Sequence, residues 1–418
     1  MKKQPAKTSA KSPKKQASNS ASKTAALLTP TAIEISERME AEYARLLNIV
    51  HKSKGTSINS RDDIKGKVFF ALRGEKVDGN AYAIAALEAG AVCAVIDNEK
   101  VLKKAQAASV AAADDKTKAA AAKLFYTENV LETLQAIGHM HRMSFDIPVI
   151  GITGSNGKTT TKELMATSLA KKFDAKGLPN SATNGVVATI GNLNTEMGVP
   201  MTLLRITDKT KVAVIEMGAK KIGDIRALCE IAAPTHGLIT NIGIAHIEGF
   251  GSKENVVKAK SELYEYVSEH GGIIFINEKD PVLKKSLKGI MSKYKVKERG
   301  PSIVTYGERN LISTKNRNPD LIGEYNLINM NAAKAVALEL RVPAKQIDDA
   351  IATYKPANMR SQHIVSKKTG NRILLDAYNA NPSSMPVAID AFLENATAKG
   401  DGTKKPAKGA AANGIPYT

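Results

Sequence analysis

Short apolar runs alternate with amphipathic segments along the middle of the chain. The runs are nearly continuous and rich in β-branched residues, as expected for strands buried on both faces of a parallel sheet. Helical segments between them would serve as crossover connections. The pattern predicts an α/β fold with a central parallel sheet within residues 146–354, whose strands are expected at residues 148–150, 212–215, 237–240, 273–276 and 303–305.

The region before this sheet, residues 29–145, has the pattern of a smaller α/β domain. It combines short strands, a helix that an Asp-Gly-Asn sequence caps, and a second helix that leads into the central sheet. Strands are expected at 57–61, 68–74 and 91–96, and helices at 78–88 and 131–143.

A third region, residues 355–396, contains one clear strand at 373–375 and a helix at 385–394. A strand followed by a helix with no returning parallel strand does not complete a sheet. We therefore expect an incomplete C-terminal domain.

The charge of the chain is unevenly distributed. Its 418 residues carry a net charge of +19, most of it in three segments rich in Ala, Lys, Ser or Thr, at 1–28, 100–123 and 397–418. These segments are predicted to be a disordered tail, a low-complexity insertion and a second tail. The remainder is mildly basic, which suits anionic nucleotide substrates, so we do not expect nucleic acid as a partner.

Cysteine content and hydropathy predict the compartment. Cys93 and Cys229 lie far apart and form no metal-ligand pattern, which is typical of structural thiols in a reducing compartment. The longest apolar stretch, residues 81–96, is interrupted by Glu88 and Gly90. It is too short to span a bilayer comfortably, so a cytoplasmic protein without membrane insertion is expected.

A glycine-rich loop follows the first strand of the central sheet. Residues 151–160 read GITGSNGKTT and precede an amphipathic helix. Glycines let backbone N–H groups surround phosphate oxygens, Lys158 can neutralise phosphate charge, and the Thr159 hydroxyl can ligate Mg²⁺. The general phosphate loop would have glycine where this chain has Ile152, so the loop is better described as T-G-x-N-G-K-T.

Polar residues follow several predicted strands. Glu216, Asn241 and Asn277 come directly after apolar runs. In open parallel sheets, ligands bind beyond the carboxyl ends of the strands, so these residues are candidates for a nucleotide site. Each asparagine could instead only cap a turn.

Several motifs beyond the loop, in the same order, resemble the Mur ligases, the ATP-dependent amide-forming enzymes of cell-wall synthesis. Within that family they are most similar to the members that add D-alanyl-D-alanine. The motifs lie at residues 188–194, 198–204, 215–219, 240–246 and 376–382, and the similarity runs from about residue 57 to 395. The resemblance implies a three-domain architecture with a central P-loop ATPase domain and a Rossmann-like C-terminal domain.

Lys260 lies in the apolar stripe of its helix, together with Val256, Leu263 and Val267. A buried lysine has a lowered pKa, and its neutral amine can react with CO₂. A lysine that extends along the helix rim into solvent would be the commoner structural interpretation. The resemblance implies a carbamylated lysine here, whose carboxylate helps to hold Mg²⁺ together with Thr159, Glu216 and His246.

The resemblance also implies residues for ATP. Lys158, Lys260, His246 and Arg360 would act in catalysis, Arg360 by reaching the phosphates. Tyr325 stands where the family usually has histidine. The residues implied in ATP binding are Gly154, Ser155, Asn156, Gly157, Lys158, Thr159, Thr160, Asn277, Asn326, Asn329 and Asp376.

Substrate contacts are implied at two further places. Ser60 and Arg61, with the segment 70–74, resemble the portion that receives the UDP end of the substrate. The remaining residues implied in substrate binding are Asn192, Asn194, Tyr378, Asn379 and Asn381.

The sequence also departs from the family pattern at three further places. These are Thr195 in place of asparagine, a loosened motif at 277–280 and an insertion at 177–187.

The resemblance implies a monomeric ligase that joins D-alanyl-D-alanine to UDP-MurNAc-tripeptide through an acyl phosphate. Two alternatives stay open. Another ligase of the superfamily, similar to folylpolyglutamate synthase, would share the phosphate loop. A catalytically weak nucleotide-binding homologue would use the basic tails for interaction.

Overall fold

The structure, a computed structural model, describes residues 30–111, 120–174, 185–243, 247–294, 300–307, 311–357, 359–379 and 384–398. Residues up to Arg45 belong to one compact unit and residues from Leu46 onward to a second. Helix α1 (Pro30–Lys52) begins in the first unit, and all three sheets lie in the second. The predicted N-terminal tail and residues 399–418 fall outside the described residues.

The first sheet has four short parallel strands in the order β1-β2-β3-β4. Strand β1 is shorter than the predicted strand at 57–61 because the Ser57 hydroxyl bonds to the backbone of Asn59 and turns the chain out of the sheet. Phe69, Ala94 and Ile96 belong to the hydrophobic core of this sheet. The strands are Thr56–Ser57, Val68–Phe70, Cys93–Ile96 and Leu124–Tyr126, and the connecting helices include η1 (Gly79–Tyr82) and α2 (Ala83–Glu88).

Helix α3 (Glu99–Ala111) occupies much of the segment predicted as a low-complexity insertion. Alanine and lysine favour helix formation, which explains why this sequence is helical despite its few large apolar residues. None of its described side chains is buried. It is a solvated helix, and residues 112–119 of the segment lie outside the described residues.

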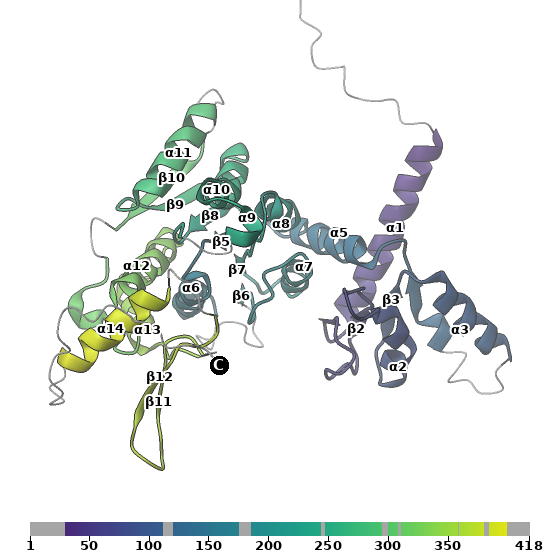
Figure 1. The fold of residues 1–418 in the computed structure, drawn as a ribbon. Coiled ribbons are helices and arrows are strands. Elements are labelled where there is room, and N and C mark those ends of the chain that lie inside the picture. The colour runs from purple at the N-terminus through teal and green to yellow at the C-terminus, as the bar shows by residue number, and fades with distance from the viewer. Residues whose placement is uncertain are drawn as a thin grey trace, which may run out of the picture. The chain divides into compact units, whose positions relative to one another are not determined.

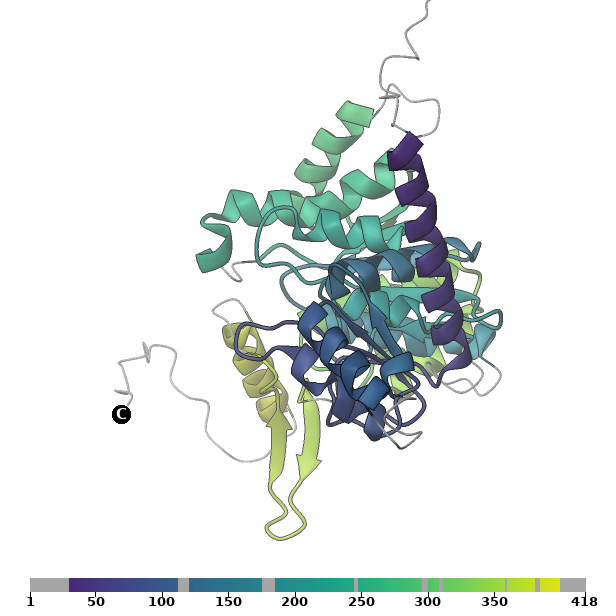
Figure 2. The same cartoon turned by 90° about the vertical axis from the view of Figure 1, so that its right-hand side faces the viewer.

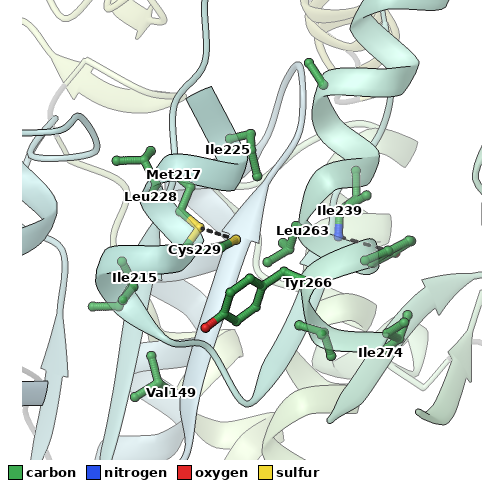
Figure 3. Close-up of a cluster of buried hydrophobic side chains, with 14 of the residues drawn as sticks. Val149, Ile215, Met217, Ile225, Leu228, Cys229, Ile239, Leu263, Tyr266 and Ile274 are labelled. Atoms are coloured by element: carbon green, nitrogen blue, oxygen red, sulfur yellow. Dashed lines mark hydrogen bonds between the residues drawn. The ribbon is translucent and has the colours of Figure 1, made fainter. Parts of the chain in front are cut away.

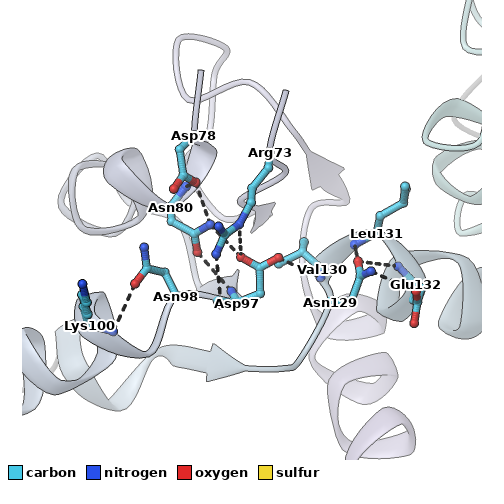
Figure 4. Close-up of polar contacts among 10 residues, drawn as sticks. All are labelled: Arg73, Asp78, Asn80, Asp97, Asn98, Lys100, Asn129, Val130, Leu131 and Glu132. Carbon is cyan, nitrogen blue, oxygen red and sulfur yellow. Dashed lines mark hydrogen bonds and ion pairs between the residues drawn. The ribbon is translucent and has the colours of Figure 1, made fainter. Parts of the chain in front are cut away.

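A polar network closes the carboxyl end of the first sheet (Figure 4). Asp97, which follows β3, accepts hydrogen bonds from Arg73 Nε at 2.8 Å and from Asn80 Nδ2 at 2.8 Å. Asn80 is 1% exposed, and its carbonyl oxygen accepts from the Asp97 N–H. The carboxylate of Asp97 also accepts a hydrogen bond from the N–H of Val130, the first residue of α5 (Val130–Met143). This network joins the connections that follow β2 and β3 to the helix that leads to the next sheet.

The second sheet has six parallel strands in the order β10-β9-β8-β5-β7-β6. The α/β class with a central parallel sheet is confirmed, and each predicted strand is present with shifts of at most three residues at its ends. Strand β6 (Val186–Ala188) was not predicted because its first two residues lie in the segment interpreted as an insertion at 177–187. The others are β5 (Val149–Thr153), β7 (Val212–Glu216), β8 (His236–Ile239), β9 (Ile273–Asn277) and β10 (Ser302–Tyr306).

Helices cover both faces of this sheet (Figures 1 and 2). One layer contains α8 (Asp224–Ala232), α10 (Lys253–Glu269) and α11 (Pro281–Tyr294). The other contains α6 (Lys158–Phe173), α12 (Glu324–Glu339) and α13 (Ala344–Thr353). Shorter helices are α7 (Gly198–Leu203), α9 (Ile247–Phe250) and η2 (Thr314–Asn316).

The core beneath α8 and α10 is tightly packed (Figure 3). Leu263 of α10 lies against β5 so closely that a Cβ atom at Gly151 would be 2.9 Å from its Cδ1. Cys229 is buried there with its thiol 3.8 Å from the Met217 sulfur, as expected for a structural thiol. This packing fixes the helix that carries Lys260.

The C-terminal region contains an antiparallel hairpin and a helix. Strand β11 (Gln362–Val365) pairs with β12 (Arg372–Leu375), and α14 (Met385–Ala398) follows. The strand and helix predicted at 373–375 and 385–394 are present, but β11 was not predicted. Several large apolar side chains on these elements are exposed, namely Ile364, Ile373, Val387, Ile389, Phe392 and Leu393.

Candidate active site

A cavity of about 1010 Å³ lies at the carboxyl ends of the central strands. Its walls come from the phosphate loop after β5, from the segments that follow β6 and β7, from the start of α12, and from the C-terminal region. Two of the three predicted strand-end polar residues, Glu216 and Asn241, therefore meet at this cavity. The phosphate loop, 154–160, forms one wall of this cavity.

Two glycines give the loop its shape. Gly154 has φ +142°, and a Cβ atom there would clash with Thr240 Oγ1. Gly157 has φ +78°, and a Cβ atom would lie 2.6 Å from Asn329 Oδ1. Both positions require a residue without a side chain, because the backbone passes close to neighbouring polar groups.

The loop is also held from the side. Asn156 N–H donates to Asn241 Oδ1 at 3.1 Å, and Asn241 Nδ2 donates to Asn156 O at 3.0 Å. Thr240 Oγ1 donates to the same carbonyl at 2.6 Å. Asn241, predicted either to cap a turn or to belong to the site, thus braces the loop and lines the cavity.

Lys158 Nζ donates to the carbonyl of Gly154 at 2.8 Å. Burial is the main cause that lowers the pKa of Lys158, and the Arg360 guanidinium adds to the effect. The charge of Glu216 opposes this lowering of the pKa, and the ammonium group, which contacts backbone carbonyls of the loop, is suited to receive an anion. Phosphate oxygens at this position would compensate both positive charges.

Glu216 and Thr159 meet next to the loop. Thr159 Oγ1 donates to Glu216 Oε2 at 2.9 Å, and Asn194 Nδ2 donates to Glu216 Oε1 at 2.9 Å. Glu216 is 1% exposed. A hydroxyl and a carboxylate are hard oxygen donors, the kind that Mg²⁺ prefers, so these residues fit that ion.

Lys260 is 3% exposed, so its side chain does not extend along the helix rim into solvent, and the buried interpretation of the two that the stripe allowed is the correct one. Burial, together with the charge of Lys158, lowers its pKa from 10.5 to about 7. Its ammonium lies 5.7 Å from the centroid of the Phe250 ring. A substantial fraction of this amine is therefore neutral at neutral pH, which carbamate formation requires.

The remaining cavity wall comes from α12 and the C-terminal region. Asn329 Nδ2 donates to Asn326 Oδ1 at 3.2 Å, and both residues line the cavity. Burial raises the pKa of the neighbouring Tyr325, so its phenol stays protonated and can donate. The Arg360 guanidinium stacks 3.7 Å from the centroid of the Tyr378 ring.

The chain is similar in sequence to proteins of one known family. A family model described as the Mur ligase middle domain matches residues 152–337, and one described as Mur ligase family, catalytic domain, matches residues 52–142. The UDP-N-acetylmuramoyl-tripeptide–D-alanyl-D-alanine ligase of Synechocystis sp. is 32% identical over 355 residues, which cover 82% of this chain and 72% of the relative. The chain belongs to the Mur ligase family.

Solved Mur ligases share the fold. The structure of UDP-N-acetylmuramoylalanyl-D-glutamyl-2,6-diaminopimelate–D-alanyl-D-alanyl ligase from Acinetobacter baumannii superposes with a TM-score of 0.64 and 25% identity, covering 84% of this chain and 76% of that chain. MurF ligase from Thermotoga maritima in complex with ADP superposes with a TM-score of 0.61 and 25% identity, covering 82% and 75%. The resemblance stated from the sequence is confirmed. The chain spans between 65% and 72% of the length of the curated relatives it matches.

The structure brings most of the residues implied by the Mur ligase pattern to the cavity and leaves some elsewhere. Asn277 does not line it, because its side chain accepts the N–H of Lys279 and closes a turn after β9. Ser60 and Arg61 lie after β1 on the first sheet and do not line it either. His246 and Asn381 are outside the described residues. The implied residues that do line the cavity also include Asn192, Asn194, Asp376 and Asn379.

Within the part of the chain that the structure describes, no group of three or more His, Cys, Asp and Glu side chains is placed to hold a metal. Of the metal ligands that the resemblance implies, Thr159, Glu216 and Lys260 line the cavity, and His246 lies outside the described residues. None of the described helices is long and apolar enough to cross a membrane.

Lys162 is a site-supporting residue that the sequence analysis missed. It is fully buried, and its Nζ donates to the Thr189 carbonyl at 2.6 Å and to Glu163 at 2.6 Å. The Thr189 hydroxyl in turn accepts from the Glu216 N–H at 2.9 Å. Lys162 thus links the phosphate-loop helix to the strand ends that carry Glu216. In the sequence, Lys162 follows Thr159 by three residues, and Thr159 faces Glu216. This spacing was a signal that could have identified Lys162.

Proposed function

We propose that this Mur ligase joins D-alanyl-D-alanine to a UDP-MurNAc-tripeptide at the expense of ATP, in the synthesis of peptidoglycan precursors. The observation that carries the proposal is the cavity in which the phosphate loop, the Glu216–Thr159 pair and a buried Lys260 with a pKa of about 7 meet. Curated relatives that are 29% to 32% identical carry the name of this ligase. We expect a monomer that acts in the cytoplasm, as the sequence analysis predicted.

The reaction has two steps. The terminal carboxylate oxygen of the tripeptide attacks the γ-phosphorus of ATP, so that an acyl phosphate forms and ADP leaves. The amine of D-alanyl-D-alanine then attacks the carbonyl carbon and loses a proton, and inorganic phosphate leaves as the amide forms. Most of the catalytic effect of the protein in such transfers comes from positioning and charge stabilisation.

The residues of the cavity fit these requirements. Lys158 and the loop N–H groups would bind the transferring phosphoryl group, and Arg360 would reach it from the C-terminal region. Asn326, Asn329 and Asp376 would contact the nucleoside end of ATP. Tyr325 would donate a hydrogen bond there in place of the histidine usual in the family.

Lys260 would act as a carbamate. The neutral amine attacks CO₂ and releases a proton, which gives a carboxylate at the wall of the cavity that Glu216 also lines. Mg²⁺ held by Thr159, Glu216, His246 and this carbamate would neutralise negative charge on the phosphate oxygens.

The acyl substrate would extend from the cavity toward the first sheet, where Ser60 and Arg61 are proposed to receive the UDP end. Near the reacting carboxylate, Asn192 and Asn194 would contact the peptide. Tyr378, Asn379 and Asn381 would contact D-alanyl-D-alanine. The tripeptide named in the Acinetobacter baumannii ligase contains D-glutamyl and diaminopimelate residues, and we propose the same glutamyl residue for the substrate of this chain.

Measuring ADP release together with the mass of the product tests the proposal. We expect ADP release that requires both UDP-MurNAc-tripeptide and D-alanyl-D-alanine, and a product heavier by the dipeptide less one water. ADP release without an amide product, or equal product formation when L-glutamate replaces the dipeptide, would contradict it.

A further inference from the structure

Two adjacent lysines of the cavity wall have no role in the mechanism above. Lys220 and Lys221 lie between β7 and α8 and line the cavity, and both are exposed. Among the ion pairs of the described residues, neither ammonium group takes part. The other cations of the wall, Lys158, Lys260 and Arg360, are accounted for by phosphate and metal chemistry.

The backbone that carries the two lysines is fixed. Their N–H groups both donate to Asp224 Oδ2, at 2.8 Å from Lys220 and 3.0 Å from Lys221. Just beyond, Glu262 of α10 accepts the N–H of Gly223 at 2.7 Å. The segment therefore holds two flexible, positively charged side chains at a defined place on the wall.

The lysines lie on the side of the phosphate loop away from the proposed nucleoside contacts. In the sheet, β7 and β6 flank β5 on one side, and β8, β9 and β10 follow on the other. Helix α12, which carries Asn326 and Asn329, packs on α6, β9 and β10. The segment of Lys220 is bound instead to the segment after β6, through the Gly218 N–H and the Asn194 carbonyl at 2.8 Å. The part of the cavity near β6 and β7 is thus left for the acyl substrate.

The acyl substrate brings negative charge to this side. A glutamyl residue within a peptide uses one carboxyl group for its amide bond and keeps the other free. We propose that Lys220 and Lys221 bind this free glutamyl carboxylate and so discriminate between the tripeptide and its uncharged amide. The inference rests on the proposed function, because that function supplies the tripeptide.

Two ammonium groups at a partly exposed wall are a modest source of affinity, since water and salt screen such pairs. The side chains are exposed, so replacing them with glutamine removes the charge and keeps the backbone hydrogen bonds and the fold. In wild type, the amide should bind more weakly than the tripeptide largely because its uncharged group is not attracted by the two ammonium groups.

The experiment measures binding by titration calorimetry of UDP-MurNAc-tripeptide and of the same compound with the glutamyl carboxylate converted to an amide. The proteins are wild type, the double variant Lys220→Gln/Lys221→Gln, and Lys285→Gln, an exposed lysine of α11 that does not line the cavity. We expect the double variant to bind the tripeptide five- to tenfold more weakly and the amide as wild type does. The control should match wild type with both compounds.

Equal weakening for the carboxylate and the amide, or no weakening for either, would overturn the assignment of the lysines. Weaker binding of ATP by the double variant would also overturn it, since the lysines would then serve the nucleotide. Turnover is measured separately on wild type. Tripeptide binding with the expected pattern but without amide formation would refute the proposed function while supporting the role of the lysines, and absence of tripeptide binding by wild type would refute both.

Discussion

The cavity is built from two regions that hold their functional groups differently. Around the central sheet, Glu216, Lys260 and Lys162 are each at most 3% exposed. Glu216 and Lys162 are also hydrogen-bonded to residues of other elements. In the C-terminal region, Arg360 and Tyr378 stack on each other beside a two-stranded hairpin. Buried groups that are hydrogen-bonded to other elements keep their geometry without a ligand. Groups on weakly buried elements reach their functional geometry when a substrate binds.

The difference in burial explains this contrast. The central sheet has a helix layer on each face, so its side chains pack in two continuous cores. The hairpin and α14 leave Ile373 at 46% and Ile389 at 50% exposed. Apolar burial is the main source of stability, so the two regions should differ in the cost of local opening. The predictions below test whether catalysis and stability follow this division.

Replacing Lys158 with alanine should have the largest effect. We expect ATP turnover to fall at least about 10²-fold, because the lysine neutralises phosphate charge. The thermal midpoint should change little, because glycines and Asn241 shape the loop rather than the lysine side chain. Steady-state ADP release and thermal unfolding measure both. Near wild-type turnover would show that the central region does not bind the phosphates.

Lys260→Ala should lose most of the activity, and added short-chain carboxylates should restore part of it. The reason is that the functional group at this position would be the oxygen pair of a carbamate rather than an ammonium. Lys258→Ala, at an exposed position of the same helix, is the control and should remain active. A fully active Lys260→Ala enzyme, or rescue by alkylamines but not by carboxylates, would contradict the carbamate.

Leucine truncations compare the stability of the two regions directly. Leu263→Ala in the central core should lower the free energy of unfolding by about 2–5 kcal/mol, because it opens a cavity against β5. Leu393→Ala on α14, where the leucine is 44% exposed, should change it by less than about 0.5 kcal/mol. Denaturant unfolding of both variants measures the difference. Similar losses would mean that α14 is as well packed as the core.

The pH dependence of stability should show the burial of Lys260. Its pKa falls from 10.5 to about 7 on folding, so the unfolded chain binds more protons between these values. The free energy of unfolding should therefore rise with pH across that window, by roughly 1 kcal/mol per pH unit relative to Lys260→Met. Denaturant titrations in CO₂-free buffer between pH 7 and 10 measure this. Parallel curves for the two proteins would show that folding does not lower the pKa of Lys260.

Periodicity and local motifs allowed much of the fold to be predicted. The central strands, the phosphate loop and the burial of Lys260 all depend on residues close in sequence, and the structure has them where the pattern placed them. Strand β6 was not predicted because it overlaps the segment interpreted as an insertion, and β11 because two of its four residues are polar and it becomes a strand by pairing with β12.

The sequence alone determined which elements form and which loop can bind phosphate, because hydrophobic period and glycine placement act locally. Only the tertiary structure decided which polar side chains share a cavity. Asn277 follows its strand as Asn241 does, yet one closes a turn and the other braces the phosphate loop. Lys162, Lys220 and Lys221 look alike in sequence, but one is buried under Thr189 and two face the cavity. Strand order and helix packing set these positions, and both depend on contacts between residues far apart in the chain.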